Sequence, residues 1–122
     1  MTEFERVLEA VRSVRCGAAD SEERLHAQVL GALAAADLQA EHEAALGPGC
    51  RIDVLCGRVG IEIKKSRPSP SALLRQLSRY AACEQVEELL VIAPRGVRLP
   101  RQIGGKRVTM IALERLWGIC LP

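Results

Sequence analysis

Two apolar runs decide the fold of this chain, Arg51-Ile52-Asp53-Val54-Leu55 and Gly60-Ile61-Glu62-Ile63-Lys64-Lys65. Both read as β-strands, and each carries an acid where a buried strand would normally have Val or Ile. A carboxylate in a buried strand is unfavourable by several kcal/mol unless a cation or a hydrogen-bond donor meets it. The simplest group that meets two such acids is a divalent metal ion, so this stretch indicates a chemical site.

The two acids and the following lysine are expected to lie together. Strand alternation places Glu62 and Lys64 on the same side of their strand. If the two runs pair as a hairpin across Gly57-Arg58, Asp53 lies near Glu62. Two neighbouring carboxylates repel each other, and Mg²⁺ resolves this with oxygen ligands at about 2.1 Å. Lys64 can orient a water and offset the negative charge of a transition state. The set predicts metal-assisted hydrolysis of a phosphodiester. The alternative is a solvent-facing Glu–Lys pair with Asp53 in a turn.

A predicted helix over residues 22–36 adds two candidates. Glu22 falls in the apolar stripe that continues with Leu25, Val29 and Leu33, so we expect it on the buried face with a partner. His26 lies one turn further on nearly the same side. Either side chain is a candidate metal ligand. The alternatives are a first-turn acid favoured by the helix dipole for Glu22, and for His26 a packing role, which is the more frequent of the two.

A third predicted helix, capped by Ser71 and running to about Cys83, carries Gln76 and Tyr80 on one face. Gln76 can hold a water or a phosphate oxygen, and Tyr80 can stack on a base or donate to a phosphate. Arg75 and Arg79 flank them with the same spacing. Taken alone, these are ordinary helix residues.

The ordered set resembles the PD-(D/E)xK nuclease superfamily across roughly residues 21–93, and the Q-x-x-x-Y element is similar to that of its RecB-type branch. The motifs that carry the resemblance are Glu22, Arg51-Ile52-Asp53, Glu62-Ile63-Lys64 and Gln76-x-x-x-Tyr80. Ile52 stands where the superfamily's name has proline, and the cysteines of its iron–sulfur members are missing.

The resemblance implies a restriction-endonuclease-like αβββαβ core and dependence on Mg²⁺ or Mn²⁺. It implies metal ligation by Asp53 and Glu62, joined by the backbone carbonyl of Ile63 and by Glu22 or His26 upstream. It further implies that Lys64 positions the attacking water, and that Gln76 and Tyr80 contact substrate or order the site.

Hydrophobic periodicity and turn residues predict an α/β fold, in which helices flank a mixed central sheet. The predicted helices cover residues 3–15, 22–36 and 71–83, and the predicted strands cover 41–46, 50–56, 59–65, 86–93 and 108–113. Cys16-Gly17 is expected to end the first helix, and a short turn to Trp117 to follow the last strand. We expect one domain over 1–122, with an additional N-terminal helix (1–16), a motif-bearing core (21–93), and a basic loop with the last strand (94–122). A short helical turn is expected near 100–102.

Charge is distributed unevenly. The net charge of +2 combines nine acids and four Lys/Arg in residues 1–50 with five acids and twelve Lys/Arg in residues 51–107. A basic surface around an acidic site suits a polyanion, although an Arg-rich solvated face would look the same. Lys65, Arg67 and the loop 95–107 are expected to contact backbone phosphates, which makes DNA the predicted partner. A homodimer that cuts both strands is a further expectation, by analogy with resolvase-like members of the superfamily.

Five scattered cysteines without a C-x-x-C pair predict reduced thiols and neither zinc nor an iron–sulfur cluster. No run approaches the roughly 18 apolar residues of a membrane span, and the charged N-terminus lacks a secretory segment. We therefore expect a cytoplasmic protein that does not bind membranes.

Three functions remain in view. The favoured one is a metal-dependent deoxyribonuclease, either endonuclease or exonuclease. The second is a catalytically inactive nucleic-acid-binding or assembly module on the same fold. The third is an unrelated α/β protein, which would leave Asp53, Glu62 and Lys64 dispersed.

Overall fold

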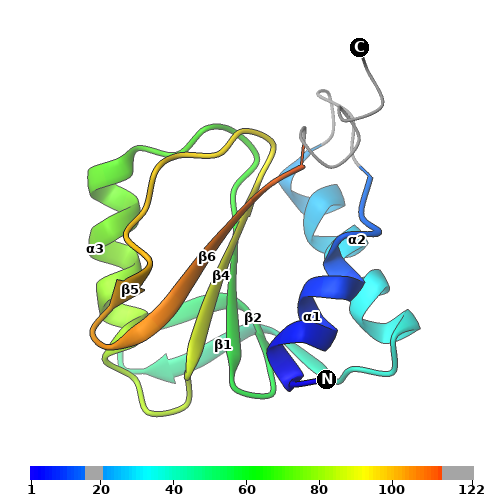
Figure 1. Cartoon of the computed structure of the whole chain (residues 1–122), viewed down its shortest axis with the longest axis horizontal. Coiled ribbons are helices and arrows are strands. Elements are labelled where there is room, and N and C mark those ends of the chain that lie inside the picture. Colours follow the sequence, from blue (N-terminus) through cyan, green and yellow to red (C-terminus); the bar gives the residue numbers. More distant parts are fainter. Residues whose placement is uncertain (16–20, 114–122) are drawn as a thin grey trace.

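The computed structural model describes residues 1–15 and 21–113, and it is an α/β fold with a mixed sheet (Figure 1). Within these residues the elements are α1 (Glu3–Val11), α2 (Glu22–Ala35), β1 (Ala40–Gly47), β2 (Cys50–Cys56), β3 (Val59–Ile63), α3 (Pro70–Ala81), β4 (Glu88–Ala93), β5 (Gln102–Ile103) and β6 (Lys106–Ala112). The predicted α/β class with a mixed sheet is thereby confirmed.

The strands form one sheet in the order β1-β2-β3-β4-β6-β5. Strands β3, β4 and β6 are parallel to one another, while β1 and β2 extend the sheet on one side and β5 on the other through antiparallel pairing. Because the three parallel strands run in the same direction, Ile63, Ala93 and Ala112 end at one edge of the sheet. The loops that follow β3 and β4 therefore start beside each other.

Helices cover both faces of the sheet (Figure 1). One apolar cluster joins α1 and α2 to the sheet and includes Val54, Ile61 and Ile63. The other joins α3 to the opposite face and includes Ile52, Leu77 and Leu89. Strand β4, from Leu89 to Ala93, is buried on both faces, as its unbroken apolar run predicts.

The helix starts have identifiable caps. Thr2 caps α1 through a capping box in which the Glu5 amide donates to Thr2 Oγ1 at 3.1 Å and the Thr2 amide donates to Glu5 Oε1 at 3.2 Å. Ser21 caps α2, as predicted, by accepting from the Arg24 amide at 3.1 Å. The predicted cap of α3 at Ser71 is wrong, because the helix already begins at Pro70. Proline is tolerated in the first helical position, where its missing N–H has no intrahelical partner.

Several element boundaries differ from the predictions by two or more residues, and one predicted element is absent. Helix α1 ends at Val11, earlier than residue 15. Residues 102–103 form strand β5, so the helical turn expected near them is wrong. The cause is the pair Gly104-Gly105, whose φ angles of +58° and +79° make a two-residue hairpin turn between Ile103 and Lys106.

The remaining sequence predictions concern thiols, unplaced segments and membranes. Within the described residues, Cys50, Cys56 and Cys83 are free thiols, as expected. The predicted helix end at Cys16-Gly17, the turn to Trp117 and the thiol of Cys120 lie outside the described residues. In the part of the chain that is described, no helix is long and apolar enough to span a membrane.

Candidate active site

The site lies where strands β2 and β3 separate. A two-residue turn at Gly57-Arg58 starts the hairpin, whose register runs from Cys56 opposite Val59 to Val54 opposite Ile61. The next pair in that register would be Asp53 and Glu62, but the backbone ladder ends before it. Instead, the Ile63 amide donates to Asp53 Oδ2 at 2.8 Å. The Asp53 carboxylate thus takes the place of a backbone acceptor and is held in the fork between the two strands.

A distortion in β1 lies opposite this fork. His42 pairs with Val54 and Ala44 pairs with Ile52, but Glu43, between them, adopts a φ of +52°. Such a backbone conformation is unfavourable for a residue with a side chain. The side-chain alternation of β2 is interrupted here. Val54 packs with α1 and α2, whereas Ile52, two residues earlier, packs with α3 on the opposite face of the sheet. Asp53 lies at this interruption.

Glu62 is the one polar or charged residue that is buried among the described residues, with 3% of its surface exposed. Its Oε2 lies 2.9 Å from Lys64 Nζ, and its Oε1 accepts from the Tyr80 hydroxyl at 3.1 Å. Burial, followed by the negative charge of Asp53, raises the pKa of Glu62 above its ordinary value, while Lys64 and Tyr80 act in the opposite direction. The expected contact between Glu62 and Lys64 is present, and Asp53 is close enough to act on Glu62.

Tyr80 joins α3 to the site from the interior. Its hydroxyl also lies 3.0 Å from the carbonyl oxygen of Arg51, and the residue is 3% exposed. Burial and the charge of Glu62 strongly raise the pKa of Tyr80, so the phenol stays protonated and acts as a hydrogen-bond donor. Tyr80 was predicted either to contact substrate or to order the site. Its buried position agrees with ordering the site, because the ring is not exposed for stacking on a nucleic-acid base.

The predicted substrate-binding side chains fall into two places. Lys64, Arg75, Gln76 and Arg79 line one groove of about 810 Å³ along α3. Arg67 lines a separate cleft at the end of the sheet, and Lys65 is exposed. The three α3 residues, Arg75, Gln76 and Arg79, thus line the same groove as Lys64, in agreement with their spacing on the helix.

Glu22 is exposed, so its predicted burial is wrong. It occupies the first turn of α2, before the buried stripe that starts at Leu25, and acids are favoured there by the helix dipole. Glu22 nevertheless lines a pocket of about 380 Å³ together with Glu23, His26, His42 and Glu43.

His26 faces Asp53. Its side chain is 13% exposed, and its Nε2 lies 3.8 Å from Asp53 Oδ2, beyond hydrogen-bonding distance. Nδ1 lies 3.1 Å from His42 Nε2, with the two rings edge to face. In the tautomer in which Nδ1 donates to His42, the lone pair of Nε2 points toward the carboxylate. His42 was not predicted as a site residue, because a single histidine in a weakly patterned strand gives no local indication of its contacts.

The possible ligand atoms of this site fit a cation at one place, between His26 and Asp53. His26 Nε2 is a buried polar atom without a hydrogen-bond partner, and such an atom is costly when nothing satisfies it. An ion between it and Asp53 would satisfy the nitrogen and offset the carboxylate charge. Elsewhere the fit is incomplete: among the described residues no group of three or more His, Cys, Asp or Glu side chains is arranged to hold a metal, and both Glu62 oxygens already have partners. A metal bound through Glu62 would share an oxygen that already contacts Lys64 or Tyr80.

Comparison of the chain with models of protein families, with curated protein sequences and with solved structures finds no match.

Proposed function

We propose that this protein is a metal-dependent nuclease that hydrolyses DNA phosphodiester bonds at the fork between β2 and β3. The observation that carries the proposal is the contact of 2.9 Å between Glu62 and Lys64, with Asp53 close enough to raise the pKa of Glu62, beside a groove lined by cationic side chains. Two acids and a lysine at the edge of a basic groove suit a reaction that adds negative charge to a bound phosphate.

The order of the elements supports a PD-(D/E)xK-like site. From α2 through β1, β2, β3 and α3 to β4, the chain follows the αβββαβ order that the sequence resemblance implies. The position of Tyr80 adds a physical reason for the Q-x-x-x-Y element, because its hydroxyl secures one oxygen of Glu62 from the interior.

Asp53, Glu62 and His26 would hold Mg²⁺ or Mn²⁺, with the Ile63 carbonyl and Glu22 as further ligand candidates. When bound, the ion supplies positive charge to the scissile phosphate and lowers the pKa of a coordinated water. The chain's own contribution is to fix the ligands: the Ile63 amide holds Asp53, and Tyr80 holds Glu62. Restricting the carboxylates in this way reduces the reorganisation needed during reaction.

Lys64 orients the attacking water and offsets charge on phosphorus. Its ammonium is held 2.9 Å from Glu62 Oε2, and its backbone amide donates to the carbonyl of Ile92 at 2.8 Å. Its position is therefore fixed at both ends. Arg75, Gln76 and Arg79 contact the backbone of the same strand, which positions DNA without reading its sequence.

The test is incubation of the protein with supercoiled plasmid, linear duplex and single-stranded DNA, with Mg²⁺, Mn²⁺ or a chelator. Nicked circles indicate an endonuclease, and loss of linear DNA alone indicates an exonuclease. Asp53→Asn and Lys64→Met should abolish cleavage while DNA binding persists. Lys65→Met is the matched control, because the exposed neighbour should affect affinity but leave the rate at saturating DNA unchanged. Cleavage by Lys64→Met at the wild-type rate would refute the proposed role.

One observation favours a second function, a catalytically inactive DNA-binding module. Both oxygens of Glu62 are engaged by Lys64 and Tyr80, which opposes metal loading. That function predicts DNA binding without cleavage in every divalent metal. A homodimer remains a prediction, which sedimentation of the protein with and without DNA would test.

A further inference from the structure

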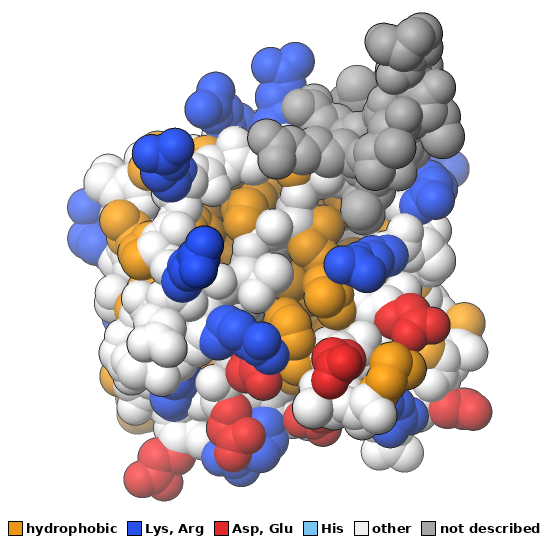
Figure 2. All heavy atoms as spheres, in the orientation of Figure 1, with side chains coloured by type: hydrophobic (Ala, Val, Ile, Leu, Met, Phe, Trp, Pro, Cys, Tyr) orange, Lys and Arg blue, Asp and Glu red, His pale blue; other side chains and the backbone are white. Residues whose placement is uncertain are grey.

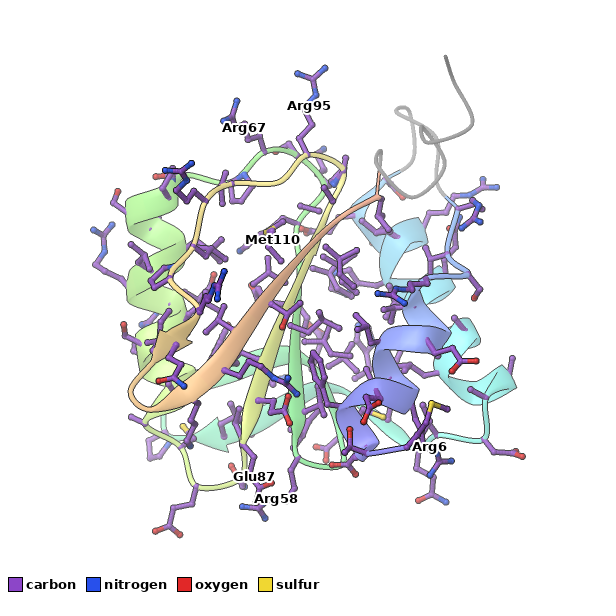
Figure 3. The ribbon with its side chains drawn as sticks, in the orientation of Figure 1. Arg6, Arg58, Arg67, Glu87, Arg95 and Met110 are labelled. Atoms are coloured by element: carbon purple, nitrogen blue, oxygen red, sulfur yellow. The ribbon has the colours of Figure 1, made fainter. Side chains whose placement is uncertain are left out.

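A second basic cleft lies at the edge of the sheet where the parallel strands end. It has a volume of about 730 Å³ and is lined by four exposed arginines from three separate parts of the chain. Arg12 comes from the end of α1, Arg67 from the loop after β3, and Arg95 and Arg98 from the loop after β4. In Figure 3, Arg67 and Arg95 project from these two loops at the same end of the molecule.

The rest of the lining is largely apolar. Val97 and Leu99 contribute from the loop after β4, and Met110 and Ile111 from β6. Arginine stems pack well on such a surface while their guanidinium groups stay at the rim. Apolar walls also lower the local dielectric, so that a contact between arginine and an anion is less screened than on an open surface.

The charged side chains in the described lining of this cleft are all arginines. Its described lining contains no Asp or Glu. At the opposite end of the sheet, by contrast, arginines pair with glutamates: Arg58 Nε lies 2.7 Å from Glu87, and Arg107 Nη2 lies 2.6 Å from Glu88. On the face shown in Figure 2, Asp and Glu side chains lie in the lower half together with Lys and Arg, while Lys and Arg side chains also lie along the upper edge. Arg12, Arg67 and Arg98, gathered at this cleft, favour a polyanionic ligand.

The cleft and the groove along α3 are separate, but they are close along the chain. Lys64 lines the groove and Arg67 lines the cleft, so one short segment of chain separates the two. Three residues span at most about 11 Å when extended. Phosphates on one DNA strand advance about 3.4 Å along the helix axis per nucleotide. A strand whose scissile phosphate lies beside Lys64 therefore reaches Arg67 within about three nucleotides.

We propose that this arginine cleft binds backbone phosphates of the substrate about three nucleotides from the scissile bond, and so extends the DNA footprint from α3 to α1. The inference rests on the proposed function for the position of the scissile bond. Binding there requires no base contact, so it raises affinity for DNA of any sequence.

The test measures DNA binding separately from cleavage. Fluorescence anisotropy with a labelled duplex of about 20 base pairs, in chelator and over a range of salt concentrations, gives the affinity and its salt dependence. Arg12→Gln and Arg98→Gln keep most of the side-chain length but remove the charge. Each should weaken binding about fivefold at physiological salt and lower the salt slope by about one, and the double variant should lower it by about two.

Arg6→Gln is the matched control, because Arg6 is an exposed arginine on the same helix as Arg12 but lies away from the cleft (Figure 3). It should bind DNA within about twofold of the wild type. The cleavage rate of Arg6→Gln at saturating DNA should also equal that of the wild type, since Arg6 does not line the cleft.

The outcomes separate the two proposals. Wild-type affinity and salt slope in the double variant would overturn the cleft inference, even if the protein cleaves DNA. Loss of affinity in the double variant, in a protein that never cleaves, would uphold the cleft as a phosphate site and refute the nuclease. A wild type that binds no DNA would overturn both.

Discussion

The backbone amide of Ile63 donates to the carboxylate of Asp53 at 2.8 Å, across the point where two neighbouring strands part. An amide that would otherwise bond a carbonyl of β2 is satisfied by a side chain instead. The same contact fixes the Asp53 carboxylate and satisfies the last amide of the β2–β3 hairpin. The position of the proposed metal ligand and the end of the strand pairing therefore depend on one hydrogen bond.

Replacing Asp53 should separate its structural and chemical roles. Asp53→Asn keeps an oxygen that can accept from Ile63, so the free energy of unfolding should change by less than about 1 kcal/mol. Asp53→Ala leaves that amide without its acceptor and should cost about 1–3 kcal/mol. Both variants should lose plasmid cleavage. Urea unfolding measures the change in the free energy of unfolding. Equal stability of the Asn and Ala variants would contradict the structural role of Asp53.

The buried Glu62 should make stability depend on pH in the direction opposite to an ordinary salt-bridged acid. Its pKa is raised above its ordinary value of 4.5, so the folded state holds the proton more tightly than the unfolded chain. The free energy of unfolding should therefore fall as the pH rises from about the ordinary value through the raised pKa.

Glu62→Gln removes this titration. Measured by urea unfolding in chelator across a pH series, the difference between the wild type and the variant should shift in favour of the variant as the pH rises. Glu41→Gln, at an exposed position in β1, controls for the loss of one carboxylate. Parallel curves for wild type and Glu62→Gln would show that Glu62 is not the group responsible.

His42 should act on metal binding through His26. Their ring nitrogens lie 3.1 Å apart, and this contact sets which nitrogen of His26 faces Asp53. Loss of such an outer partner typically weakens metal affinity about 10- to 100-fold. We expect His42→Ala to weaken Mn²⁺ binding by about tenfold, as measured by the electron paramagnetic resonance signal of the free ion. If His26→Ala weakens Mn²⁺ binding and His42→Ala does not, the orienting role is wrong.

Gly60 should be sensitive to a single methyl group. A Cβ at this position would lie 2.7 Å from Ile52 Cδ1 and 3.3 Å from Leu89 Cδ2, both buried under α3. Gly60→Ala should cost about 1–3 kcal/mol in unfolding free energy. Ile52→Val removes the crowded methyl and alone costs about 0.5–1.5 kcal/mol. The double variant should lose less than the sum of the two, and strict additivity would rule out this contact.

The sequence correctly predicts the parts of the fold that depend on local hydrophobic pattern. Helical periodicity predicts all three helices, and the unbroken run in β4 predicts its burial on both faces. Alternation along β3 correctly brings Lys64 to Glu62, because side chains two apart in a strand share a face.

Features set by distant neighbours escaped prediction. Glu22 matches the apolar stripe of α2 in spacing, yet its turn lies ahead of the buried part of the helix, and periodicity cannot tell where the sheet begins to cover a helix. The positive φ of Glu43 and the contact of His42 with His26 arise from the pairing of β1 with β2 and from the docking of α2. Such contacts have no local signature.

Placing Glu62 inside the hydrophobic interior has an evolutionary consequence. The charge of a carboxylate there opposes folding, so a glutamine, which is neutral and can still accept a hydrogen bond from Tyr80, should raise the melting temperature while abolishing any reaction that needs the acid. Under selection for heat resistance alone, this glutamate would be among the first residues to disappear. Its retention would therefore be a sign that a lineage still uses the site.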